Sequence, residues 1–102
     1  MYTIDDIRQK AIEGAHNYNH TAKTGRRLSS VSLFGSYANG NAREDSDVDL
    51  LVAFETNPVS LFDMAKVLSE MENAFGSPVD IVKEPLTAGS FLAIDKKVPL
   101  YG

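Results

Sequence analysis

The chain has 102 residues, 43% hydrophobic and 24% charged, which is the composition of one ordinary globular domain. Its 14 acidic and 10 basic residues give a net charge of −4, so we expect no direct contact with nucleic acid. The absence of cysteine excludes disulfides, thiolate zinc sites and cysteine nucleophiles. No apolar run approaches the roughly 20 residues of a membrane span, and residues 1–6 lack the form of a signal peptide, so we expect a cytoplasmic protein without membrane contact.

The first predicted element is an amphipathic helix over residues 3–22. Thr3 can cap its start, with Asp6 three residues later as in a capping box. Gly25, within the polar turn at residues 23–27, is the expected stop. The apolar residues that recur at three- and four-residue steps are Ile4, Ile7, Ala11, Ala15, Tyr18 and Ala22.

A short strand at residues 31–34 is predicted to lead into Gly35 and Ser36, followed by a helical turn that Gly40 ends. The first N–H groups of such a turn attract anions. Gly35 allows close approach of the backbone to a ligand, and Ser36 adds a hydroxyl donor. These features favour a phosphate-binding loop.

Asp47 and Asp49 open an apolar run at residues 50–54 that is typical of a buried strand. Alternate strand residues share a face about 6.6–6.8 Å apart, so the two carboxylates can converge. At about 6.8 Å they repel by roughly 0.6 kcal/mol in water and 2.4 kcal/mol at an effective dielectric constant of 20. A hard cation relieves this repulsion, and Mg²⁺ prefers a few carboxylates plus substrate phosphates. The pattern therefore predicts a site for a metal-bound triphosphate.

A second amphipathic helix is predicted from residue 61 to 75, capped by Ser60 and ended by residues 76–78. A short strand at residues 79–82 follows, with one acid, Asp80, among branched apolar residues. If this strand lies beside the one with the paired acids, Asp80 faces the same side as they do. A surface edge strand is the alternative explanation.

The C-terminal part is predicted to contain a short helix at residues 87–96 and a strand at residues 98–101, which Pro99 confines to a sheet edge. We expect a single domain, with a helix and turn at residues 1–27 and the core at residues 28–102. The fold class is α/β (α+β), a small mixed sheet flanked by helices.

Two other metal sites are disfavoured. His16 and His20 have the spacing of helical metal ligands but lack the acid of a His-Glu-x-x-His motif. A calcium loop starting at Asp45 would need glycine where Leu50 stands and glutamate where Thr56 stands.

The combined pattern resembles the DNA polymerase β-like nucleotidyltransferase superfamily. It consists of Gly35-Ser36, ten residues, then Asp47-x-Asp49, in the settings Phe-Gly-Ser-Tyr-Ala and Ser-Asp-Val-Asp-Leu. The resemblance extends over residues 28–101, and within the superfamily it is strongest to the minimal nucleotidyltransferases, the antitoxins of HEPN/MNT toxin–antitoxin pairs. The family often has a basic residue where Asn39 stands.

The resemblance implies a polymerase β-like core and a set of roles. Asp47 and Asp49 would bind two Mg²⁺ ions, and Asp80 would join them on one ion and help deprotonate the attacking hydroxyl. Gly35 and Ser36 would hold the β and γ phosphates of ATP. The reaction is in-line displacement at the α-phosphorus, with pyrophosphate leaving.

The implied function is transfer of AMP from ATP to a hydroxyl, expected on a tyrosine, of a cognate HEPN ribonuclease toxin, which is thereby neutralised. One alternative is a non-catalytic antitoxin or binding module that neutralises its partner by occlusion. Another is a nucleotidyltransferase that acts on a small molecule, although such enzymes usually need a further domain to hold it.

Overall fold

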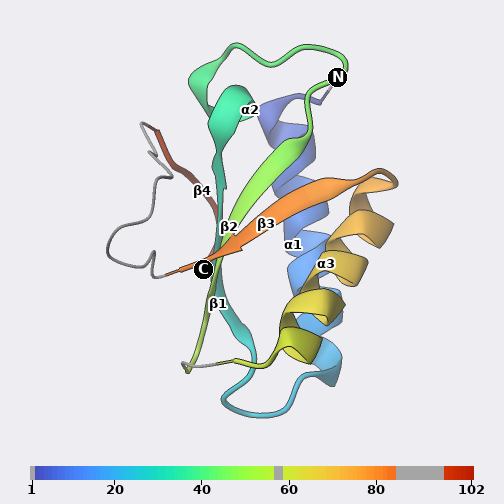
Figure 1. Ribbon diagram of the computed structural model, residues 1–102, viewed down its shortest axis with the longest axis vertical. Helices are drawn as coiled ribbons and strands as arrows, with labels where there is room; N and C mark the ends of the chain where they lie inside the picture. Colours follow the sequence, from blue (N-terminus) through green and yellow to red (C-terminus); the bar gives the residue numbers. More distant parts are fainter. Residues whose placement is uncertain (1, 57–58, 85–95) are drawn as a thin grey trace.

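The structure, a computed structural model, describes residues 2–56, 59–84 and 96–102. Figure 1 shows two long helices lying together on one face of a four-stranded sheet. Among the described residues, no helix is long and apolar enough to cross a membrane. Of the helix predicted at residues 87–96, all but Lys96 lies outside the described residues. The elements are α1 (Ile4–Thr21), β1 (Leu28–Phe34), α2 (Gly35–Asn39), β2 (Val48–Phe54), α3 (Leu61–Phe75), β3 (Val79–Lys83) and β4 (Val98–Tyr101).

The sheet is mixed, as predicted, with the strand order β3-β2-β1-β4. Strand β1 pairs antiparallel with β2 and with β4, whereas β2 and β3 are parallel. A parallel pair needs a crossover connection, and α3 supplies it between β2 and β3 (Figure 1). Strand β4 lies at the sheet edge, as Pro99 indicates.

Strand β2 alternates between the core and the opposite face of the sheet. Val48, Leu50 and Val52 are buried in the same apolar cluster as Ile7 of α1 and Met71 of α3. Because successive strand side chains point to opposite faces, the residues between them, Asp49 first, face away from the helices. The alternation that the sequence predicts therefore determines which face carries the acids.

Both long helices begin with the predicted caps. Thr3 accepts a hydrogen bond from the backbone N–H of Asp6, whose carboxylate accepts one from Thr3 N–H. Ser60 and Asp63 form the same reciprocal box at the start of α3. Helix α3 ends at Gly76 in the left-handed conformation, with φ of 72°.

The end of α1 differs from the prediction. The helix stops at Thr21 with Ala22 in an extended conformation, and Gly25 lies further along in the turn with φ of 88°. Asn19 explains the earlier end, because its side chain pairs with the backbone of Leu28 through hydrogen bonds of 2.7 and 3.2 Å. This pairing draws the chain back toward the start of β1 within a few residues.

Helices α1 and α3 approach closely at Gly14. A Cβ atom on Gly14 would lie 2.6 Å from Met71 Sδ, 3.3 Å from Met71 Cα and 3.4 Å from the carbonyl oxygen of Glu70. Since Met71 is fully buried, its side chain has little room to move away. A buried glycine therefore sets the distance between the helices.

Gly14→Ala is expected to destabilise the protein by about 1 kcal/mol, because overpacking costs about 1–3 kcal/mol and outweighs a helix-propensity gain of about 1 kcal/mol. Asn17→Ala, at an exposed position of α1, is the control and should be neutral or slightly stabilising. Urea denaturation measures both. Unchanged or increased stability of the Gly14 variant would mean that the helices do not pack this closely.

Candidate functional site

The site is centred on Gly35, where β1 passes into α2. Phe34, the last residue of β1, pairs with Asp49 of β2, so Gly35 lies directly beside that acid. Gly35 has φ of 75°, and a Cβ atom there would lie 2.1 Å from Asp49 Oδ2 and 3.0 Å from its Cγ. Any side chain at position 35 would displace the carboxylate. The sequence predicts that Gly35 lets a ligand approach the backbone, which stays a prediction; the structure shows that Asp49 approaches Gly35 closely.

Asp49 and Asp80 stand opposite each other in the parallel register of β2 and β3. Burial is the main cause that raises the pKa of the Asp49 carboxyl, followed by the negative charge of Asp80, a hydrogen bond with Asp80 and the charge of Asp47. The metal-free protein therefore holds a proton on the Asp49 carboxyl more tightly than a free aspartate would. A cation bound beside Asp49 is therefore favourable, because it offsets the negative charges around this carboxyl.

Asp47 precedes β2 rather than opening it, because the strand begins at Val48. Its side chain is exposed, and it acts on Asp49 through its charge. Within residues 2–56, 59–84 and 96–102, no three acidic or histidine side chains converge closely enough to hold a metal ion by themselves. The structure thus brings Asp49 and Asp80 together, with Asp47 beside them as a further charge.

Ser36 is the second residue of α2 and is half-buried. Its carbonyl oxygen accepts hydrogen bonds from the N–H groups of Gly40 and Asn41, which closes the short helix. Its hydroxyl makes no hydrogen bond with the described part of the chain, so it can donate to a ligand. Gly35 lies against Asp49 and Ser36 follows it in the chain, and their role in binding phosphate stays a prediction.

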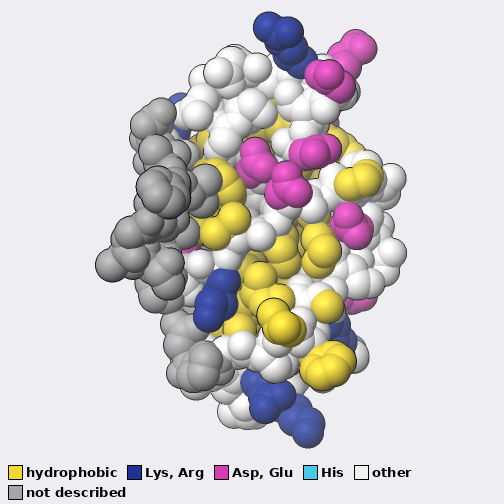
Figure 2. All heavy atoms as spheres, viewed as in Figure 1, with side chains coloured by type: hydrophobic (Ala, Val, Ile, Leu, Met, Phe, Trp, Pro, Cys, Tyr) yellow, Lys and Arg dark blue, Asp and Glu magenta, His cyan; other side chains and the backbone are white. Residues whose placement is uncertain are grey.

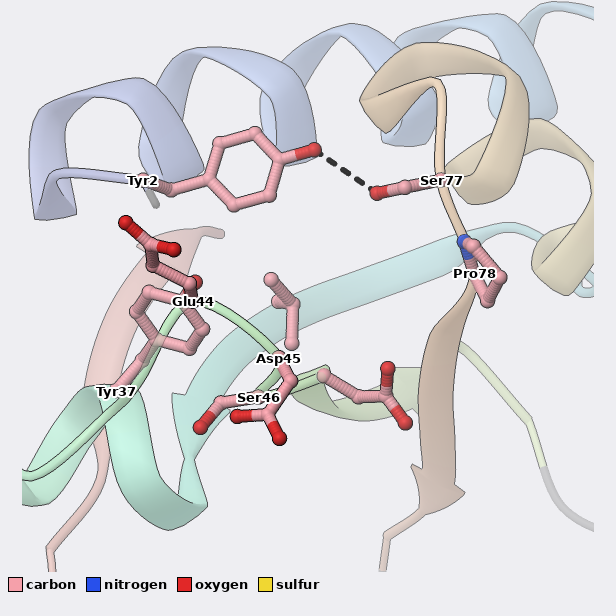
Figure 3. A pocket seen from close by; sticks show the side chains of 9 residues that line it. Tyr2, Tyr37, Glu44, Asp45, Ser46, Ser77 and Pro78 are labelled. Atoms are coloured by element: carbon pink, nitrogen blue, oxygen red, sulfur yellow. Dashed lines mark hydrogen bonds between the residues drawn. The ribbon is translucent and has the colours of Figure 1, made fainter.

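A cavity of about 400 Å³, lined in part by Asp47, lies at the start of β2, and Figure 3 shows it from close by. It is lined by Tyr2 before α1, Tyr37 of α2, residues 44–48 and the turn at residues 77–78. Figure 2 shows acidic side chains gathered over the half of the sheet where β2 begins. Sequence reasoning missed Tyr2 and Ser77, since nothing local in either segment indicates that they meet.

Packing explains one of the two histidines of α1, His16. The His16 ring contacts Tyr101 of β4 edge to face, with ring centroids 5.6 Å apart and an interplanar angle of 82°. This contact attaches the edge strand to α1.

Asp49→Asn is expected to stabilise the metal-free protein by on the order of 1 kcal/mol, or roughly 4–8 °C in Tm, because it removes a repelled charge. The folded protein binds the Asp49 proton more tightly than the unfolded chain does. The free energy of unfolding therefore falls as the pH rises from the unfolded pKa of about 3.9 to the raised folded pKa. Thermal denaturation in EDTA from pH 3.5 upward should show this fall in the wild type and its loss in the variant. Glu13→Gln, at an exposed position, is the control, and equal pH profiles for wild type and the Asp49 variant would contradict the assignment.

Comparison with known proteins identifies the family of this chain. The sequence model of the family "Polymerase beta, Nucleotidyltransferase" matches residues 17–95. The protein adenylyltransferase MntA of Thermococcus cleftensis is 39% identical over 90 residues, which cover 87% of this chain and 86% of that protein. A toxin–antitoxin crystal structure with AMP-PNP has the same fold, with a TM-score of 0.68 and 22% identity over 93% of this chain and 73% of that chain. A structure assigned to the minimal nucleotidyltransferases is 36% identical, with a TM-score of 0.57 over 79% of this chain and 74% of that chain. The chain therefore belongs to the polymerase β-like nucleotidyltransferase family and is a nucleotidyltransferase.

Proposed function

We propose that the protein transfers AMP from ATP to a hydroxyl of a partner protein, and that it thereby acts as the antitoxin of a HEPN ribonuclease toxin in the cytoplasm. The observation that carries this proposal is the Asp49–Asp80 pair with Gly35 packed against it. The relationship to a protein adenylyltransferase supports protein as the acceptor class. The AMP-PNP toxin–antitoxin complex, similar in fold, supports a nucleotide and a toxin partner.

The residues fit a hard divalent cation. Burial and two neighbouring negative charges raise the Asp49 pKa, and bound positive charge relieves that unfavourable state. Since the described residues lack a three-ligand group, substrate phosphates would complete the coordination, as Mg²⁺ prefers. In this proposal Asp47, Asp49 and Asp80 hold two Mg²⁺ ions. The bound metal would supply neutralisation of the charge that develops on the attacking and leaving oxygens.

The remaining roles belong to the chain itself. Gly35 and Ser36 hold the β and γ phosphates, which orients the α-phosphorus toward the acceptor. The acceptor oxygen forms a bond to the α-phosphorus, the bond from that phosphorus to the bridging oxygen breaks, and pyrophosphate leaves. The acceptor proton passes to the Asp80 carboxylate. Positioning and charge stabilisation provide most of the rate enhancement in such chemistry, so a small domain can carry it out. In this proposal residues 28–102 form the catalytic core and residues 1–27 the N-terminal helix and turn.

Incubating the protein with ATP, Mg²⁺ and the partner encoded by the neighbouring gene should increase the partner's intact mass by whole AMP units. EDTA or the double substitution Asp47→Asn with Asp49→Asn should abolish the increase. Peptide mapping should place the modification on a hydroxyl, which we expect to be a tyrosine. A stable complex that protects cells without any gain in mass would overturn transfer in favour of occlusion.

Gly35→Ala is expected to reduce the rate of transfer at least about 100-fold, since a displacement of about 1 Å in a positioned group can cost this much. Gly40→Ala is the matched control. Gly40 also has a left-handed backbone, with φ of 79°, but its Cβ would meet nothing within 4 Å. Both variants bear a similar backbone strain, so only the displacement of Asp49 separates them. Equal rates for the two variants would contradict the role of the Gly35–Asp49 contact.

A further inference from the structure

The cavity beside the acids shares Asp47 with the proposed site. Val48 also lines it, whereas Asp49, the next residue of β2, faces the other side of the sheet. On the opposite side, Ser77 and Pro78 lead directly into β3, which carries Asp80. Its volume of about 400 Å³ falls within the range of ligand pockets, about 300–1,000 Å³. A group bound there would lie within a few residues of the reacting groups.

The lining carries uncompensated negative charge. Glu44, Asp45 and Asp47 all line the cavity, and among the described residues no lysine or arginine does. None of the three forms an ion pair with the described part of the chain, and neither does Arg43, which precedes them. A cation entering the cavity therefore meets three carboxylates that no described lysine or arginine already pairs with.

Tyr37 supplies an aromatic wall with an unused polar group. The residue is only 7% exposed, yet its hydroxyl makes no hydrogen bond with any described residue. Its ring extends toward Tyr2 (Figure 3), with the two centroids 6.3 Å apart and an interplanar angle of 53°. The Tyr2 ring already attracts one cation, since Lys10 Nζ lies 5.9 Å from its centroid. Two tyrosine rings beside carboxylates are the chemistry that recognises a cationic side chain.

The Tyr2 wall is fixed in place before any ligand arrives. Its hydroxyl donates to the carbonyl oxygen of Phe75 at 2.9 Å. A tyrosine has one O–H donor, so the Ser77 hydroxyl, also 2.9 Å away, must donate to Tyr2 (Figure 3). The Phe75 ring supports Tyr2 edge to face at 5.6 Å and 89°. The cavity is therefore preorganised, which reduces the entropic cost of binding.

We infer that this cavity is the acceptor subsite and that it binds the guanidinium of an arginine next to the hydroxyl that receives AMP. A guanidinium stacks on aromatic rings and binds carboxylates with paired hydrogen bonds, which an ammonium does less well. The binding of arginine is a property of the cavity alone. Its assignment to the acceptor protein rests on the proposed transfer of AMP.

Binding is tested without nucleotide or metal, so that it does not depend on transfer. Nα-acetyl-arginine methylamide is titrated into ¹⁵N-labelled protein and compared with the citrulline analogue, which has the same shape without the charge. We expect saturable chemical-shift changes confined to Tyr2, Tyr37, residues 44–48 and Ser77. The arginine probe should bind at least fivefold more tightly than the citrulline probe. Equal affinities, or changes spread over the acidic surface, would overturn the inference.

Charge-removing variants assign the binding to the lining. Glu44→Gln with Asp45→Asn should weaken the arginine probe at least fivefold. The control, Asp5→Asn with Glu13→Gln, removes the same charge from exposed positions of α1 and should change affinity less than twofold. Thermal denaturation of each variant verifies that it is folded. An equal loss of affinity in both double variants would show only a general effect of net charge and would overturn the subsite.

Two further measurements separate this inference from the proposed function. In AMP transfer, the Glu44/Asp45 double variant should raise KM for the partner protein at least fivefold, with kcat and KM for ATP within twofold of the wild type. If AMP-PNP displaces the arginine probe and shifts the same tyrosines, the cavity is a base-binding site and the inference fails. If the probe binds as expected but the partner gains no AMP, the transfer proposal fails while the arginine site stands.

Discussion

The repulsion between Asp49 and Asp80 is the constraint on which the rest of the site depends. Neighbouring strands lie about 4.8 Å apart, and two charges at that distance repel by roughly 0.9 kcal/mol in water and 3.5 kcal/mol at an effective dielectric constant of 20. On the other face of β2, Val48, Leu50 and Val52 are buried, and each contributes about 1.5–3 kcal/mol. The apolar face therefore outweighs the cost on the polar face. The sheet can therefore hold Asp49 and Asp80 in an unfavourable pairing, which keeps the site ready for positive charge.

The same apolar burial fixes the register that creates the pair. Val48 pairs with Val79, and both are buried, which places Asp49 opposite Asp80. A slip of one residue would turn Asp80 toward the helices and Val79 toward the open face, because side chains alternate along a strand. Such a slip would bury a charge and expose an apolar residue at once. Core packing on one face thus selects the arrangement of Asp49 and Asp80 on the other.

The sequence predicts those parts of the site that depend on strand periodicity and on local residue chemistry. Alternation along the two strands is sufficient to place Asp49 and Asp80 on one face, provided that the strands are neighbours. The contact between Gly35 and Asp49 depends on the antiparallel pairing of β1 with β2, and the motif reveals only that a close approach is needed. The position of Asp47 outside the strand depends on where hydrogen bonding to β3 begins. Tyr2 is beyond local reasoning, because its hydrogen bonds reach residues more than 70 positions away.

Asp47 affects the Asp49 carboxyl and also lines the cavity, so the acids and the cavity are not independent of each other. Its charge contributes to the raised pKa of Asp49, and its side chain lines the cavity that we assign to arginine. A cation held beside Asp47 would weaken the repulsion that Asp47 exerts on Asp49, since opposite charges within about 4–6 Å favour the ionised form. Binding of the acceptor and preparation of the acids would then be linked through one side chain. This sharing would give the proposed transfer selectivity, because a neutral segment in the cavity leaves the acids in their repelled state.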